Sequence, residues 1–122
     1  MASLTEVGEF QEEINKLLGT ALPAGKIFQS DGLRIHLIKH NHHDCLDHLP
    51  DIPEIISSPD YVGVNPNESV PSVEYIKVYE KNIMVGVKLD VTDHYLYVAS
   101  MYSISPSKIE RRLHSGRIKK LP

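Results

Sequence analysis

The sequence predicts an α+β domain, in which N-terminal helices pack on a roughly four-stranded antiparallel sheet and a short helix follows near the C-terminus. Two observations lead to this class. Apolar residues in the first half recur at spacings of three and four, whereas those in the second half alternate with polar residues in successive segments. We expect one domain over residues 1–122, because this length can bury a core. Residues 1–25 would form an N-terminal helix and linker, and residues 26–122 the core.

The first segments are interpreted as a helix, a short strand and a second helix. Residues 5–18 carry apolar side chains at helical spacing and are followed by a glycine, which predicts a helix. Residues 26–29 predict a short strand. Residues 33–40 fit a strand or a helix, and we favour a helix because Asp31 can cap it.

A further helix and a short strand are expected before the long alternating segments. The helix would begin near Asp44 and be divided into two turns by Pro50 and Pro53, because proline lacks the backbone N–H that a helix interior needs. Residues 61–64 predict a strand, and the polar residues 65–71 predict a loop.

The clearest prediction is a β-hairpin. Residues 73–80 and 83–90 both alternate, and Lys81-Asn82 lies between them as a two-residue turn. This turn would pair Val78 with Val85 and place these apolar residues on the core face.

The chain then predicts a third strand and a last helix. Residues 95–103 alternate and would extend the sheet as an antiparallel strand. Ser105 is a suitable N-cap, Pro106 suits the first helical position, and Gly116 can end the helix.

The opposite face of the predicted hairpin combines cations with aromatic rings. In the predicted register Tyr75, Lys77, Tyr79 and Lys88 share this face, and Lys77 lies opposite Gly86, which leaves room above the sheet. Lysines can hold phosphates, and tyrosine rings can stack on bases, so the pattern suits RNA. It is also typical of an ordinary exposed sheet face.

Histidines are concentrated in residues 33–48, which hold five of the seven. His36 and His40 share one side of a helix and would lie close enough to serve one small site. The other histidines and Cys45 could add metal ligands, but this segment lacks the glutamate of HExxH and any CxxC pair.

The net charge of −3 conceals a basic C-terminal stretch. Its cations could bind phosphate or could form a solvated tail. They are Lys108, Arg111, Arg112, Arg117, Lys119 and Lys120. The single cysteine and the absence of a long apolar run or a secretion signal predict a cytoplasmic protein that does not contact a membrane.

The segments HLIKH, PDYVG, EYIKVYE, YLYVASMYSI and SKIERRLHSGRI occur in this order between residues 31 and 118. In this order they resemble the phage-encoded branch of the barnase–EndoU–colicin–RelE-like nucleases. The resemblance implies helices on a four-stranded antiparallel sheet and a metal-independent ribonuclease or toxin without a cofactor. The implied partners are RNA and an antitoxin or immunity protein.

The resemblance also gives positions for the catalytic site. By position it makes His36, His40, Lys77 and the hydroxyl group near the end of the last strand catalytic candidates. Ser100 stands where the family pattern has threonine, and Tyr102 follows two residues later. A bulge would be needed to bring Ser100 and Tyr102 to the side of Lys77. The candidate substrate-binding residues are Tyr75, Tyr79, Lys88, Arg111 and Arg112.

These residues suit RNA cleavage by the 2′-hydroxyl group of the substrate. His40 would act as base with His36 as its partner, and Lys77 would stabilise charge on the phosphoryl oxygens. Two alternatives stay open. They are a phage-associated interaction module without catalysis and a metal-binding protein built on the histidine cluster.

Overall fold

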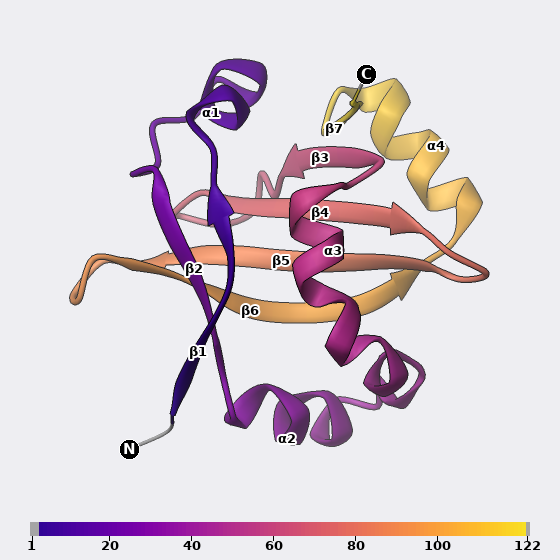
Figure 1. The fold of residues 1–122 in the computed structure, drawn as a ribbon. Helices are drawn as coiled ribbons and strands as arrows, with labels where there is room; N and C mark the ends of the chain where they lie inside the picture. The colour runs from indigo at the N-terminus through magenta and orange to yellow at the C-terminus, as the bar shows by residue number, and fades with distance from the viewer. Residues whose placement is uncertain (1–2, 122) are drawn as a thin grey trace.

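The computed structural model describes residues 3–121, so residues 1, 2 and 122 of the predicted domain lie outside the described residues. The described chain forms a seven-stranded sheet with helices on both of its faces (Figure 1). The strands are β1 (Leu4–Phe10), β2 (Gly25–Ser30), β3 (Tyr61–Val64), β4 (Ser72–Val78), β5 (Asn82–Asp90), β6 (Tyr95–Ile104) and β7 (Ile118–Lys120). The helices are α1 (Glu12–Leu18), α2 (Gly32–Lys39), the 3₁₀ helix η1 (His43–Asp51), α3 (Ile52–Ser57) and α4 (Pro106–Ser115).

The predicted α+β class is confirmed, but the predicted four-stranded antiparallel sheet was wrong. The strand order is β1-β2-β6-β5-β4-β3-β7, and β2 runs parallel to β6, so the sheet is mixed. The sequence analysis missed β1 and β7 because both are edge strands with few buried side chains, and such strands carry a weak alternating pattern.

The expected helix over residues 5–18 is a strand followed by a short helix. Val7 and Phe10 are buried three residues apart, which imitates a helical spacing. In β1 this spacing arises from a register shift between Glu6 and Gly8, where Val7 bulges out of the pairing with β2. Residues 4–10 adopt a strand because the edge of β2 has unpaired backbone N–H and C=O groups. Pairing with these groups satisfies the hydrogen bonding of the β1 backbone.

The main core lies between one face of the sheet and the helices α2, η1 and α3. Leu33 and Leu37 anchor α2 in this core, and Ile52 and Ile55 anchor α3. Pro50 lies inside η1 and α3 begins at the residues that follow, which confirms the predicted division of this segment. The start of α2 differs from the prediction, because the Asp31 side chain forms no cap and Ser30 Oγ instead accepts a hydrogen bond from the Gly32 N–H at 2.9 Å.

A second, smaller core lies on the other sheet face under α4. Ile109 of α4 packs there on Ile76, Met84, Ile104 and Ile118. The predicted boundaries of this helix are confirmed. The N-cap Ser105 Oγ accepts a hydrogen bond from the Lys108 N–H at 3.2 Å, and Gly116 ends the helix with φ 84°. This core covers only one end of the face, which leaves the rest for a polar site.

None of the helices between residues 3 and 121 has the length and apolar character needed to span a lipid bilayer.

Candidate active site

The register of the β4–β5 hairpin decides which side chains share a face, and the predicted register was wrong. Val78 pairs with Asn82 and Lys77 with Ile83, so residues 79–81 form the turn. Lys77 therefore lies opposite Ile83 rather than Gly86. Because neighbouring residues of a strand point to opposite faces, this shift separates Lys77 from Lys88 and Gly86.

Three predicted site residues consequently lie on the α3 side of the sheet. Tyr75 is buried in the main core at 1% exposure, and its hydroxyl group has no hydrogen-bond partner among the described residues. Burial raises the Tyr75 pKa above its ordinary value. Tyr79 Oη donates a hydrogen bond to Glu54 at 2.7 Å, and Lys77 Nζ donates one to the Ser58 carbonyl at 2.7 Å. The prediction that these side chains form an open face with Lys88 was wrong.

A bulge in β6 brings Ser100 and Tyr102 to the other face. The register shifts between Gly86 and Val87, where Ala99 has no partner in β5. Beyond the bulge Ser100 pairs with Gly86 and Tyr102 with Met84. A bulge of the kind that the sequence analysis required is therefore present, but it places the two hydroxyl groups with Gly86 rather than with Lys77.

This face contains a cavity of about 340 Å³ between α2, the loop after β3, and strands β4 to β6. Its lining includes His36, Glu74, Gly86, Lys88, Ser100 and Tyr102. We call it the sheet pocket. Gly86 keeps it open, because a Cβ atom at this position would lie 2.5 Å from Ser100 Oγ. Lys88 is held at the pocket by an ion pair of 3.0 Å with Glu68.

The end of α2 brings three histidines close together. Asn41 adopts φ 60°, and the N–H groups of Asn41 and His42 donate to the carbonyl oxygens of Ile38 and Leu37, which is a Schellman ending with asparagine in place of glycine. This ending turns the chain so that the His42 ring lies 5.9 Å from the Tyr102 ring. His42 was not singled out from the sequence, because its proximity to Tyr102 depends on this turn.

His36 is the histidine that lines the sheet pocket, and the ring of His40 packs against it at 4.4 Å. Desolvation lowers the His36 pKa below its ordinary value of 6.5, and the charges of His40, His42 and Lys39 lower this pKa further. His36 is therefore largely neutral near pH 7, which is the state in which an imidazole can accept a proton.

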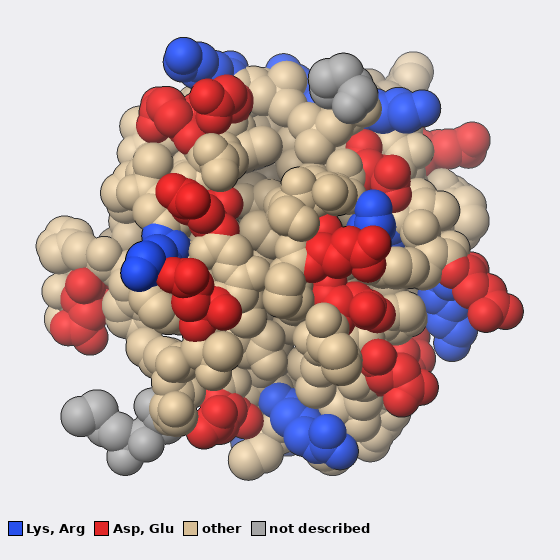
Figure 2. Space-filling model, in the orientation of Figure 1, with Lys and Arg blue, Asp and Glu red and all other residues tan. Residues whose placement is uncertain are grey.

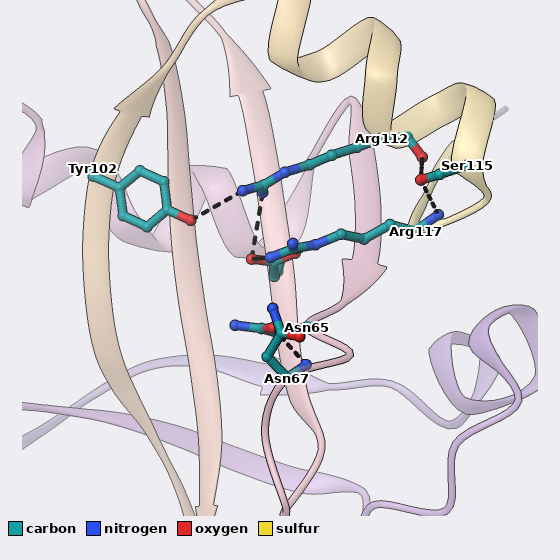
Figure 3. A network of polar contacts seen from close by, with 7 residues as sticks. Asn65, Asn67, Tyr102, Arg112, Ser115 and Arg117 are labelled. Atoms are coloured by element: carbon teal, nitrogen blue, oxygen red, sulfur yellow. Dashed lines mark hydrogen bonds and ion pairs between the residues drawn. The ribbon is translucent and has the colours of Figure 1, made fainter.

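A buried carboxylate, that of Glu74, pairs with Arg112 and Arg117, and Arg112 lies next to Tyr102 (Figure 3). Arg117 donates two hydrogen bonds of 2.9 Å to Glu74, and Arg112 Nη1 lies 3.5 Å from the same carboxylate. The hydrogen bonding to Glu74 raises the Arg117 pKa. Arg112 Nη2 also reaches Tyr102 Oη at 3.5 Å. One arginine thus touches two residues of the pocket wall.

Sequence reasoning missed Glu74, although the pattern contained a signal. Glu74 has the same phase in its strand as Val78, which was assigned to the core face. A carboxylate in a core phase needs buried cations as partners, and the basic C-terminal stretch holds three arginines, two of which pair with Glu74. The strand pattern could not show which of the six C-terminal cations reach it.

The structure thus brings together part of the predicted site. His36, Lys88, Ser100 and Tyr102 line the sheet pocket, with His40 behind His36 and Arg112 against Tyr102. Arg111 lies on α4 in a neighbouring groove. Tyr75, Lys77 and Tyr79 lie on the other face. Among residues 3–121, no three His, Cys, Asp or Glu side chains are placed to hold a metal ion, so the metal-binding alternative gains no support from the geometry.

Comparison with protein families matches residues 5–111 to the family described as phage-Barnase-EndoU-ColicinE5/D-RelE like nuclease3. The chain belongs to this nuclease family. The match covers most of the chain and confirms the resemblance found in the sequence. Comparisons with curated proteins and with solved structures found no match. The nuclease family fixes the general activity, and the sheet pocket of this nuclease is the described cavity that holds most of the predicted catalytic residues.

Proposed function

We propose that this nuclease is a metal-independent endoribonuclease whose reaction takes place in the sheet pocket. The observation that carries the proposal is that one cavity is lined by His36, Ser100 and Tyr102, with Arg112 3.5 Å from Tyr102 Oη. These groups supply a proton acceptor, hydroxyl groups and a cation. RNA supplies the nucleophile, its own 2′-hydroxyl group, so the reaction needs in addition only a proton donor for the leaving oxygen.

In the proposed reaction His36 is the base. It is the imidazole that lines the pocket, and its lowered pKa keeps it neutral at physiological pH. His36 accepts the proton of the 2′-hydroxyl group as the 2′-oxygen bonds to phosphorus. This assignment replaces the predicted role of His40 as base, since His40 lies behind His36 and acts on it through its charge.

The remaining groups act on the phosphate and on the leaving oxygen. Arg112 and Lys88 stabilise the charge that develops on the phosphoryl oxygens, and Ser100 and Tyr102 orient the phosphate by hydrogen bonding. As the bond from phosphorus to the 5′-oxygen breaks, His42 donates a proton to that oxygen. The products are a 2′,3′-cyclic phosphate and a 5′-hydroxyl group.

The test is incubation of the purified protein with RNA in excess chelator, followed by mass spectrometry of the fragments. We expect fragments that end in a 2′,3′-cyclic phosphate, and we expect DNA of the same sequence to stay intact because it lacks the nucleophile. Cleavage of both nucleic acids, or fragments that carry 5′-phosphates, would contradict the proposal. Absence of cleavage would favour the interaction module without catalysis.

The pH dependence should report the interaction between His36 and His40. Because the base must be unprotonated, kcat/KM should rise with pH through the His36 pKa, with a midpoint below 6.5. In His40→Gln the neighbouring positive charge is absent, so the His36 pKa should rise and the midpoint should move to higher pH. NMR titration of the His36 ring checks the same shift without activity. An unchanged or lower pKa in this variant would show that the two rings are not coupled.

A further inference from the structure

A second cavity lies beside the sheet pocket, between α4, β7 and the loop that follows β3. It has a volume of about 810 Å³, and we call it the basic groove. Five cations line it: Lys108, Arg111, Arg112, Arg117 and Lys119. Its lining within residues 3–121 includes no acidic side chain. A groove with this lining is expected to concentrate anions.

The helical spacing of residues in α4 explains why its cations line the same side of the basic groove. Arg111 and Arg112 follow Lys108 by three and four residues, so both lie beside it on the same face of the helix. Gly116 then reverses the chain into β7, which adds Lys119 to the same groove. The sequence showed this concentration of charge, but only the turn at Gly116 brings the two segments together.

The groove also has apolar walls. Leu18, Val64 and Pro66 line it beside the cations. A nucleotide has this same combination of groups, since it carries a charged phosphate and a flat base with an apolar face. An inorganic phosphate or an acidic peptide would use the cations but would leave these apolar surfaces exposed to water.

Arg112 joins the basic groove to the sheet pocket. Its side chain lines the groove, and its guanidinium group lies 3.5 Å from both Glu74 and Tyr102, which line the pocket (Figure 3). The two cavities therefore meet at Arg112, and an RNA strand whose reacting phosphate lies in the pocket would have its flanking nucleotides near the groove.

We propose that the basic groove binds the phosphates and bases of single-stranded RNA that flank the cleaved bond. The proposal rests on the proposed function and specifies the substrate class as RNA of several nucleotides. Acidic side chains are spread across the face that α3 covers (Figure 2), which would repel RNA from that side. The groove is the cavity that offers both cations and apolar walls next to the reacting group.

Lys108 and Arg111 are the residues on which to test this proposal. Both are exposed, and neither forms an ion pair with a side chain of residues 3–121. Arg112 and Arg117, by contrast, are held by Glu74, so their replacement would disturb the fold as well as the charge. A change at Lys108 and Arg111 isolates the contribution of the groove.

The experiment measures binding separately from cleavage. A labelled 2′-O-methyl RNA of about twelve nucleotides lacks the nucleophile, and fluorescence anisotropy gives its Kd over a range of salt concentrations. We expect Lys108→Gln/Arg111→Gln to raise Kd about tenfold near ~100 mM salt and to flatten the dependence of log Kd on log salt by roughly 1.4. The control with the same charge change is Lys26→Gln/Lys81→Gln, because both residues are exposed and lie outside the groove. The control should bind like the unchanged protein.

The outcomes separate this proposal from the proposed function. Equal Kd values and salt dependences for the groove variant and the unchanged protein would overturn the groove proposal, even if RNA is cleaved. Displacement of the RNA by poly-glutamate of equal charge and concentration would also overturn it and would indicate an acidic protein as the occupant. Tight, groove-dependent binding without cleavage of unmodified RNA would support the groove and contradict the proposed function.

Discussion

Replacement of His36 by glutamine is expected to lower kcat/KM for RNA cleavage by about 10²–10⁴-fold, because a general base contributes an effect of this size. Glutamine keeps a polar side chain of similar length but cannot accept the proton of the 2′-hydroxyl group. The change should not unfold the protein. His36 is exposed and its side chain makes no hydrogen bond within the described residues, so its replacement should alter the free energy of unfolding by less than about 0.5 kcal/mol.

A single assay series tests this assignment. Initial rates with a short RNA would be compared for the unchanged protein, His36→Gln and His114→Gln, with Tm measured for each. His114 is an exposed histidine of α4 outside both cavities, so its variant should cleave normally. If His36→Gln retains full activity while Lys77→Gln loses it with an unchanged Tm, the reaction takes place on the α3 face and the sheet pocket is not the active site.

Replacement of Glu74 by glutamine is expected to lower the free energy of unfolding by about 3–5 kcal/mol, the usual effect of removing one partner from a buried ion pair. The Glu74 side chain is 2% exposed, and its arginine partners are only 10% and 19% exposed. Without the carboxylate, Arg112 and Arg117 would remain largely buried without a compensating charge. Urea unfolding measured by circular dichroism gives this difference.

The matched control for Glu74 is Glu68→Gln, which breaks the ion pair with Lys88. Both of those side chains are about one third exposed, so the expected loss is below about 1 kcal/mol. In the variant Glu74→Gln/Arg117→Gln one uncompensated charge is removed, and the loss should be smaller than the sum of the single losses. Equal losses in Glu74→Gln and Glu68→Gln would show that the buried network contributes no more than an exposed pair.

Local sequence signals predicted the elements whose ends are set by their own residues. The N-cap residue Ser105 and the terminating residue Gly116 predicted both ends of α4 correctly, because these residues satisfy the backbone groups of the helix ends. The strands β3 to β6 were found near their correct positions, because successive side chains of a strand point to opposite faces of the sheet and give the sequence a period of two. The prediction of a helix over residues 5–18 failed because a spacing of three residues occurs both in a helix and beside a β-bulge.

The composition of the site was predicted better than its arrangement. The sequence pointed to His36, Ser100 and Tyr102, and the fold brings them to one cavity. The sequence also predicted Lys77 in that site, and this prediction depended on a turn of two residues. The turn is residues 79–81, so the pairing partner of Lys77 shifts by three residues, from Gly86 to Ile83, and Lys77 lies on the other face.

By itself the sequence determined the α+β class, the nuclease family and the amphipathic patterns, since these depend on residue types and on spacing along the chain. The tertiary structure alone decided the register of the hairpin, the bulge at Ala99 and the burial of Glu74 between two arginines. These features depend on contacts between residues far apart in the chain. A strand has nearly equal local energy in neighbouring registers, and only packing against the rest of the sheet selects one of them.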